Sequence, residues 1–367
     1  MRVALVHEYM VQYGGAERVL ESLRELFPKA PIFTLLHDPK STNGKFKDAD
    51  IRTSFLQKIP FAKKYHRLFP VLMPFAIEQF DLSYYDLVIS DSASFAKGII
   101  TLPKTKHICY CHTPMRFAWD DCQSYTKESD YPALIKKFVP FVMNYVRIWD
   151  EVAAKRVDHF VANSNFVASR IKKYYQQEST VIYPPVDACK MRAQTDNRKK
   201  QPRYFLAFAR LLSYKNIEVA IDVFNQLGLP LKIVGVGPMM KKLKKKANIN
   251  IEFLGFIPDE KKAEIYANAR AFIFPQEEDF GITAVEAMAC GTPVIAYRGG
   301  GALETVIDGV SGMFFNEQTS QSLLKAVYKF IAEENTFDKT KIQECALPFD
   351  KEVFKKNIKS TIEKICE

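Results

Sequence analysis

The sequence predicts an α/β protein made of two doubly wound domains, each built on a parallel sheet. First, the 367 residues exceed one ordinary domain and fit two of typical size. Second, short apolar runs alternate with amphipathic stretches along both halves, which is the pattern of repeated βα units. Third, this alternation stops at Pro184-Pro185 and a polar, basic linker over residues 190–203. We therefore expect one domain over residues 1–188 and another over 189–348.

Each domain contains six predicted strands, with helices between them. In the first domain we expect strands at 2–7, 32–36, 86–90, 107–111, 159–162 and 180–183, and helices at 16–27, 142–157 and 165–175. In the second domain we expect strands at 204–209, 231–235, 251–254, 271–274, 293–297 and 313–315, and helices at 216–227, 239–247, 259–269, 284–289, 302–307 and 319–333. Ligands of such sheets bind outside the carboxyl ends of the strands. Two facing domains would place the site in the cleft between them.

The last segment, residues 349–367, has apolar residues at Ile358, Ile362 and Ile365. This spacing predicts a helix with one apolar face. The helix either caps the second domain or crosses back to the first, and the periodicity alone does not choose between these.

The composition is that of a soluble globular protein, with 47% hydrophobic and 26% charged residues. No apolar run is long enough to span a bilayer, and Glu8 comes too early for a secretory signal. Seven scattered cysteines do not form a disulfide framework, which favours a reducing cytoplasm.

Two groups of residues could be taken for metal ligands, and neither has the pattern of a known metal site. Cys109, Cys111, His112 and Cys122 lack the C-x-x-C spacing of a zinc knuckle, so we expect small buried thiols. Asp120-Asp121 is an acid pair, but cations elsewhere could do a metal's work. We expect neither a metal nor another cofactor.

The net charge of +10 is compatible with nucleic acid, an anionic membrane or phosphorylated substrates as partners. No nucleic-acid motif is present, so we expect no nucleic acid. The lysines within residues 241–246 indicate a solvated helix face. Over 58–75, basic residues are mixed with large apolar ones, which fits either a plain surface helix or a membrane interface. The basic residues there are Lys58, Lys63, Lys64 and Arg67.

Charged residues follow two predicted strands of the second domain. Arg210 leaves the end of one strand and Lys215 lies near the next helix start, which suits a diphosphate. After the strand at 271–274, three acids precede Gly281 and an apolar helix that carries Glu286. Glu278 and Glu286 are eight residues apart, so they can line one pocket at different depths. Carboxylates suit sugar hydroxyls because they accept charge-assisted hydrogen bonds.

The first domain offers two further candidates. Gly14-Gly15 opens a helix and could present bare N–H groups to a phosphate or acceptor, although an ordinary turn has the same composition. His112 ends a predicted parallel strand, where it could donate to a sugar hydroxyl or to charge that develops in the transition state. A structural histidine remains the alternative.

Several short sequence motifs occur along the chain in the order that a known family shows. In the second half they are Arg210-x4-Lys215-Asn216, Gly235-Val236-Gly237-Pro238, Phe253-Leu254-Gly255 and Glu278-x7-Glu286 with the tail Ala287-Met288-Ala289-Cys290-Gly291-Thr292-Pro293-Val294. In the first half they are Gly14-Gly15-Ala16-Glu17, His112-Thr113-Pro114 and Val161-Ala162-Asn163-Ser164. The set resembles the retaining glycosyltransferases of family 4, which have the GT-B fold of two Rossmann-like domains that face a cleft. Residues 111–120 are similar to bacterial O-antigen and exopolysaccharide mannosyltransferases.

The resemblance implies a role for each matching residue. Arg210 and Lys215 would hold the donor diphosphate, Glu286 the ribose and Glu278 the donor sugar, and His112 would contact that sugar near the reacting carbon. Gly14 and Gly15 would border the phosphates, and the backbone of Phe280, Gly281, Ile282 and Thr283 would meet sugar and phosphate. The family often has Pro where this chain has Thr283, which puts the details of sugar recognition in doubt. The family also implies that the helix over 349–367 crosses back to the first domain, which would be the acceptor side.

The expected function is retaining, metal-independent transfer of a hexose from a GDP- or UDP-sugar, with mannose from GDP-mannose preferred. The acceptor would be a polyprenyl-diphosphate-linked or other glycan of surface polysaccharide synthesis. We expect a cytoplasmic protein that attaches peripherally to the inner face of the membrane. The alternatives are an epimerase-like enzyme of the same fold, or a basic module that binds membrane or nucleic acid. The alternative of a basic module leaves Glu278 and Glu286 unexplained.

Overall fold

The computed structural model describes residues 1–65, 69–120, 133–195 and 204–366. Arg67, Asp121 and Cys122 of the sequence predictions therefore lie outside the described residues, as does the second half of the predicted linker. Contacts between residues divide the chain into two compact units. Unit 1 comprises Met1–Tyr183 and Lys355–Glu367, and unit 2 comprises Pro184–Phe354.

Unit 1 is built on a seven-stranded, wholly parallel sheet with the order β3-β2-β1-β4-β5-β6-β7. The strands are nearly continuous buried runs, as expected for a parallel sheet covered on both faces. From β1 the strand order proceeds through β2 and β3 to one edge of the sheet, and β4 then starts on the other side of β1. The strand order therefore reverses between β1 and β4. The strands are β1 (Val3–Met10), β2 (Ile32–His37), β3 (Ile51–Thr53), β4 (Leu87–Ser92), β5 (Lys106–Cys111), β6 (His159–Ala162) and β7 (Ser179–Val181).

Unit 2 repeats this design with six parallel strands in the order β10-β9-β8-β11-β12-β13. Its reversal lies between β8 and β11. The strands are β8 (Tyr204–Phe208), β9 (Leu231–Val234), β10 (Ile251–Gly255), β11 (Ala269–Phe274), β12 (Val294–Tyr297) and β13 (Gly312–Phe315). The predicted class of two doubly wound, parallel-sheet α/β domains is confirmed.

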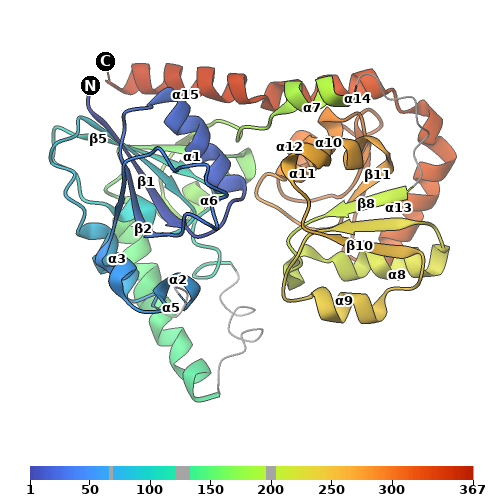
Figure 1. Ribbon diagram of the computed structural model, residues 1–367, viewed down its shortest axis with the longest axis horizontal. Helices are drawn as coiled ribbons and strands as arrows, with labels where there is room; N and C mark the ends of the chain where they lie inside the picture. Colours follow the sequence, from blue (N-terminus) through green and yellow to red (C-terminus); the bar gives the residue numbers. More distant parts are fainter. Residues whose placement is uncertain (66–68, 121–132, 196–203, 367) are drawn as a thin grey trace. The chain divides into compact units, whose positions relative to one another are not determined.

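Helices cover both faces of each sheet (Figure 1). In unit 2, α8 and α9 lie on one face, and α10, α11 and α12 lie on the other. The helices of unit 1 are α1 (Gly15–Leu26), α2 (Ala62–Tyr65), α3 (Leu72–Glu78), α5 (Ala133–Ala154) and α6 (Asn165–Tyr175). Those that follow are α7 (Ala188–Thr195), α8 (Ile217–Leu227), α9 (Met240–Lys246), α10 (Asp259–Ala267), α11 (Ile282–Ala289), α12 (Ala302–Thr305), α13 (Ser320–Glu333), α14 (Lys339–Ala346) and α15 (Lys351–Cys366).

Several elements differ from the sequence predictions. The interpretation of residues 190–203 as a linker is wrong in its first part, because α7 runs to Thr195 and buries Met191 in unit 2. The strands β1 and β4 extend further than expected, to Met10 and Ser92, because polar residues at their ends are buried. Helix α5 begins nine residues earlier than predicted, and Pro140 lies inside it.

The C-terminal segment is a single helix, α15, which begins in unit 2 and belongs to unit 1 from Lys355 onward. Its start is fixed within unit 2, where Asp350 accepts a hydrogen bond from the N–H of Cys189 at 2.9 Å. Its later part is fixed within unit 1, where Lys355 Nζ lies 2.5 Å from Glu25 Oε2.

Candidate active site

The candidate site of unit 2 lies at the carboxyl ends of β8 and β11, where the strand order reverses. Ligands of open α/β sheets bind at this switch point. Arg210 follows β8 and is exposed, and Lys215 lies in the short 3₁₀ turn η4 (Ser213–Lys215) that leads into α8. Glu278 follows β11 in the loop before α11. The two neighbouring strands therefore bring the predicted cations and the predicted carboxylate to one edge of the sheet.

Lys215 and Glu278 form an ion pair across 63 residues of sequence. Their side chains are largely covered, with 12% and 24% exposed. Gln276 Nε2 donates a further hydrogen bond to Glu278 Oε1 at 3.3 Å. Gln276 is itself buried, and its Oε1 has no hydrogen-bond partner within the described part of the chain. This glutamine was missed in the sequence analysis, because a polar residue in a loop has no distinctive local pattern.

Glu286 is a buried carboxylate on the first turns of α11. The O–H group of Tyr266, on α10, donates to Glu286 Oε2 at 2.9 Å. The ring of Tyr266 stacks on Phe208 at the end of β8, with the ring centroids 5.7 Å apart. Glu286 is therefore not a solvated helix residue, and its orientation is set by an aromatic side chain that the sequence analysis did not single out.

Helix α11 starts directly after Gly281, which adopts φ 92° and ψ 54°. This left-handed conformation favours glycine, and a Cβ there would lie 2.9 Å from the ring of Phe274. Phe280 is buried, whereas Ile282 and Thr283 are partly exposed at the start of the helix. The predicted backbone positions are thus the residue before the helix, its N-cap and the first two residues of α11.

A turn of three glycines after β12, residues 299–301, packs directly against the acidic loop. A Cβ on Gly300 would lie 2.3 Å from the carbonyl oxygen of Glu278, and one on Gly301 would lie 2.4 Å from Cα of Phe280. Gly301 also donates its N–H to the Glu278 carbonyl at 2.8 Å. These glycines, which the sequence analysis did not select, let the backbone approach closely enough to fix the position of Glu278.

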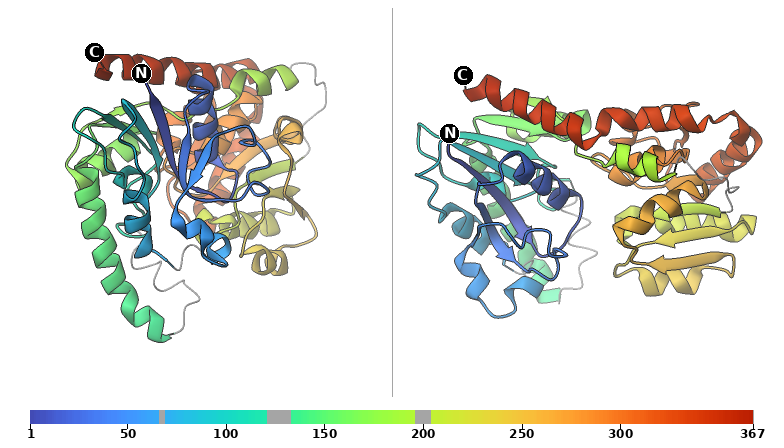
Figure 2. Two further views of the ribbon diagram at one scale, coloured as in Figure 1. Left: turned by 60° about the vertical axis from the view of Figure 1, so that its left-hand side comes forward. Right: turned by 45° about the horizontal axis from the view of Figure 1, so that its top comes forward.

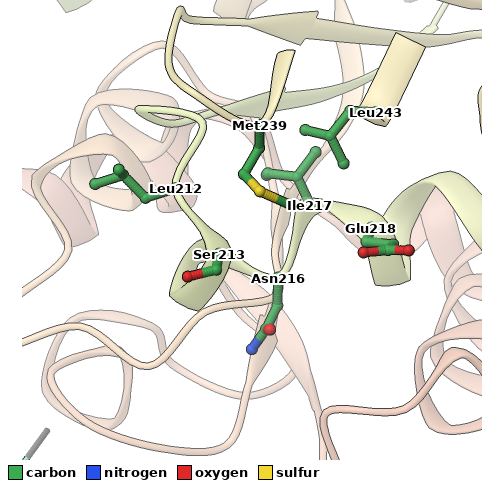
Figure 3. A pocket seen from close by; sticks show the side chains of 7 residues that line it. All are labelled: Leu212, Ser213, Asn216, Ile217, Glu218, Met239 and Leu243. Atoms are coloured by element: carbon green, nitrogen blue, oxygen red, sulfur yellow. The ribbon is translucent and has the colours of Figure 1, made fainter. Parts of the chain in front are cut away.

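A small pocket of about 50 Å³ lies beside the Lys215 turn, between the start of α8 and the start of α9 (Figure 3). Its lining mixes apolar side chains with a few polar groups: Leu212, Ser213, Asn216, Ile217, Glu218, Met239 and Leu243. The turn at 235–237 packs closely on the chain just before the pocket residue Leu212, because a Cβ on Gly237 would lie 2.4 Å from the carbonyl oxygen of Leu211.

The candidate site of unit 1 lies at the corresponding reversal between β1 and β4. His7 and Asp91 are register partners on these strands, and His112 follows β5, which pairs with β4. His7 Nδ1 lies 2.8 Å from Asp91 Oδ2, and His112 Nε2 lies 2.6 Å from Asp91 Oδ1. Asp91 is fully buried, and the side chain of His112 is 14% exposed. One buried carboxylate thus holds two imidazoles.

These contacts shift the three pKa values. Burial by itself would raise the pKa of Asp91, but the charges and hydrogen bonds of His112 and His7 outweigh it and hold that pKa below its usual value. Burial lowers the pKa of each histidine, but the partner carboxylates outweigh it. The pKa of His112 is therefore raised by Asp91, and that of His7 is raised well above its usual value by Asp91 and Glu17.

Glu17 connects this group to the predicted Gly14-Gly15 turn. Glu17 Oε1 lies 3.7 Å from His7 Nε2, and its Oε2 accepts the N–H of Gly14 at 2.8 Å. The expectation of a bare N–H is therefore wrong for Gly14. Gly15 is the first residue of α1.

The described members of the two groups that could have been taken for metal ligands have other contacts. Cys109 and Cys111, both on β5, are buried in one apolar cluster with residues of β6 and α6, as expected for small core thiols. Asp120 accepts hydrogen bonds from Arg170 and Tyr174. Across the described ranges, no cluster of three or more His, Cys, Asp or Glu side chains could hold a metal ion.

Two family models match the chain, one on each half. A model described as Glycosyltransferase Family 4 matches residues 13–189, and a model described as Glycosyl transferases group 1 matches residues 191–343. Among curated relatives, the chain is 24% identical to the alpha-1,3/1,6-mannosyltransferase ALG2 of Dictyostelium discoideum, over 86% of each chain. It is 30% identical to the O-antigen chain mannosyltransferase C of Escherichia coli, over 49% of this chain and 53% of that one.

Solved structures share the fold at low sequence identity. HepE of Anabaena in complex with UDP-glucose superposes with a TM-score of 0.71 at 19% identity, covering 99% of this chain and 100% of the other. Sucrose-phosphate synthase of Thermosynechococcus elongatus gives a TM-score of 0.73 at 17% identity, with 99% of each chain covered.

Proposed function

Because the chain belongs to the glycosyltransferases that join a Family 4 domain to a group 1 domain, we propose that it transfers a hexose from a nucleotide sugar with retention of anomeric configuration. The donor is GDP-mannose, and the acceptor is a lipid-linked or other glycan of surface polysaccharide synthesis. The names of the relatives from Dictyostelium and Escherichia coli support mannose as the sugar. HepE binds UDP-glucose, so a UDP-sugar is the alternative donor that should be compared with GDP-mannose.

The observation that carries this proposal is the Lys215–Glu278 pair at the switch point of unit 2. A cation and a carboxylate in contact suit a ligand whose diphosphate and sugar are adjacent, because the lysine can bind phosphoryl oxygens while the carboxylate accepts from sugar hydroxyls. Arg210 adds a second cation at the same edge, and Gly15 borders the phosphates. The N–H groups at the start of α11, over residues 280–283, favour negative charge.

Glu286 then binds the hydroxyl groups of the ribose. Its carboxylate is buried and held by the O–H of Tyr266, so it is oriented before the ligand arrives. A preoriented carboxylate accepts two hydroxyl groups at a small loss of side-chain entropy.

The reaction proceeds without a metal ion. The leaving nucleoside diphosphate gains negative charge as the glycosidic bond breaks, and Arg210, Lys215 and the α11 N-terminus stabilise it. His112 donates a hydrogen bond to the donor, and the departing phosphate accepts the proton of the acceptor hydroxyl on the same face. Glu278 holds the donor sugar and stabilises positive charge at its anomeric carbon.

A panel of sugar nucleotides tests this proposal. Purified protein is incubated with GDP-mannose, UDP-glucose, UDP-galactose and UDP-N-acetylglucosamine, and slow hydrolysis or transfer is followed by release of the nucleoside diphosphate. We expect GDP-mannose to turn over fastest, with full activity in chelator and an α-linked product by NMR. Loss of activity in chelator that magnesium or manganese restores, or an inverted product, would contradict the mechanism. Turnover of none of these donors would contradict the function.

We also propose that the protein attaches peripherally to an anionic membrane surface on the cytoplasmic side. In the described part of the chain, no helix has the length and apolar content needed to cross a bilayer. In the predicted basic-aromatic segment 58–75, Phe61 and Phe75 are 77% and 57% exposed, and Lys63 is exposed beside them in sequence.

Helix α5 adds a second exposed apolar surface in unit 1 that the sequence analysis did not select. Figure 2 shows it running along the flank of that unit. Its buried face packs on the core of unit 1, while side chains three and four residues apart on the opposite face are between 46% and 74% exposed. Exposed apolar groups next to lysines suit a membrane interface. The exposed residues are Phe138, Phe141, Tyr145, Ile148 and Val152.

A further inference from the structure

Four ionisable side chains form a line in unit 1, and the proposed function uses only the last of them. In order they are Glu17, His7, Asp91 and His112, contributed by α1, β1, β4 and the residue after β5. The first three are buried, with 2%, 3% and 0% exposed side chains. His112 is 14% exposed, so the line runs from the core to the surface at the carboxyl edge of the sheet.

The geometry determines which nitrogen atoms carry protons. His7 Nδ1 lies 2.8 Å from Asp91 Oδ2, and His7 Nε2 lies 3.7 Å from Glu17 Oε1. An ionised carboxylate only accepts hydrogen bonds, so Nδ1 carries a proton toward Asp91. Burial lowers the pKa of His7, but the two acids outweigh it and raise that pKa well above its usual value, so the ring is an imidazolium. The charges of Glu17 and His7 then cancel, and Asp91 is left with its own negative charge to share with His112.

The backbone of His112 is held by Ser92, the last residue of β4, and by Asn163, which follows β6. Its N–H donates to the carbonyl of Ser92 at 2.8 Å, and its carbonyl accepts from Asn163 Nδ2 at 2.9 Å. Its Nε2 faces Asp91 and must therefore donate. Within the described ranges, Nδ1 of His112 forms no hydrogen bond, so this nitrogen remains for a ligand.

The loop after Asp91 is fixed by a second carboxylate. Glu8 Oε1 accepts hydrogen bonds from Ser92 Oγ at 3.0 Å, from the N–H of Ala93 at 2.8 Å and from the N–H of Ser94. Since these residues follow Asp91 directly, the position of the Asp91 carboxylate is rigidly determined.

We propose that Asp91 is a positioning residue that keeps His112 protonated at both ring nitrogens, so that its Nδ1–H donates to a phosphoryl oxygen of the nucleotide sugar. His7 and Glu17 support Asp91 from the buried side. This inference rests on the proposed function. A phosphoryl oxygen is the fitting acceptor because the leaving diphosphate gains negative charge, whereas an imidazolium next to the anomeric carbon would oppose the positive charge that develops there.

The pH dependence follows from the groups that face His112. Burial lowers the pKa of His112, and the positive charge of His7 lowers it further. The charge and hydrogen bond of Asp91, with a smaller contribution from Glu8, outweigh both and raise this pKa. The reacting form is protonated, so the rate is retained below the pKa of His112 and falls as the pH rises through it. Removal of the Asp91 charge should move this fall to lower pH.

The test is Asp91→Asn in the full-length protein, because the side chain keeps its size and loses its charge. Histidine titrations followed by NMR, assigned with His112→Asn, should show the pKa of His112 lower by about one unit or more. The fall of kcat/KM for GDP-mannose at high pH should move to lower pH by the same number of pH units. His159 serves as an internal control, since it bonds Thr180 at 3.0 Å elsewhere in the sheet and should titrate unchanged.

Glu17→Gln provides a second variant if Asp91→Asn does not fold. The glutamine oxygen can still accept from Gly14, and the titration of His112 should move in the same direction by a smaller amount. A pKa of His112 that does not move in either variant would overturn the proposal. So would a lowered pKa without movement of the rate profile, and in that case the proposed function would stand. If no sugar nucleotide turns over, the proposed function fails and with it the role of Nδ1, while the titration still decides whether Asp91 holds the proton.

Discussion

Replacement of Lys215 by methionine should weaken donor binding strongly and leave the fold intact. The lysine side chain is 12% exposed, and its ammonium group contacts Glu278. A lost charge-assisted contact to the diphosphate costs about 1.5–3 kcal/mol, which is a 10- to 150-fold rise in Kd. The upper part of this range is expected, because Glu278 would then face the diphosphate with its charge uncompensated.

The same change should affect unfolding little. Partly exposed ion pairs contribute up to about 1 kcal/mol, so Tm should fall by no more than about 4 °C. The assay is calorimetric titration of GDP and UDP into wild type, Lys215→Met and Lys232→Met. Lys232 is a matched control, because it pairs with Glu252 at 3.3 Å in the same unit and lies near the amino ends of the strands. Binding of both nucleotides by Lys215→Met within twofold of wild type would refute the diphosphate assignment.

Three further predictions follow from the same structure. Glu278→Gln should lower kcat about 100-fold or more while the Kd of GDP changes less than about tenfold, since the lost charge stabilised the anomeric carbon and not the phosphates; an unchanged kcat would contradict this role. Tyr266→Phe keeps the ring stack with Phe208 but removes the 2.9 Å hydrogen bond to Glu286, so it should weaken GDP binding and lower the free energy of unfolding by about 1–3 kcal/mol. Equal GDP affinity in a calorimetric titration would exclude Glu286 from ribose binding. Charge reversal of Lys58, Lys63, Lys64 and Arg67 should abolish sedimentation with phosphatidylglycerol vesicles, because each basic residue contributes about 1 kcal/mol near an anionic surface. Reversal of the exposed Lys241 and Lys245 on α9 is the control and should leave vesicle binding unchanged. If the variant with the four reversed charges still binds vesicles, segment 58–75 is not the attachment surface.

Most of the candidate site in unit 2 could be proposed from the sequence because its residues follow strands that local patterns reveal. A short apolar run followed by charged residues marks the end of a buried parallel strand, and this places Arg210 and Glu278 at the carboxyl edge of the sheet, where ligands of such folds bind. Glu286 stood out for the same kind of local reason, as an acid among apolar neighbours on a helix. The partners that orient these groups, Gln276 and Tyr266, gave no comparable signal, because a polar residue in a loop or a tyrosine on a helix has many ordinary explanations.

The sequence by itself determined the two α/β units, the parallel strands and the edge at which the charged residues gather, because hydrophobic periodicity and strand ends are local properties of the chain. Only the tertiary structure decided which of those residues meet. His7 and Asp91 are 84 residues apart, and they pair because β4 inserts next to β1 in register. Lys215 reaches Glu278 because β11 lies next to β8. The order of strands in a sheet depends on the packing of the whole domain, and a local pattern contains no record of it.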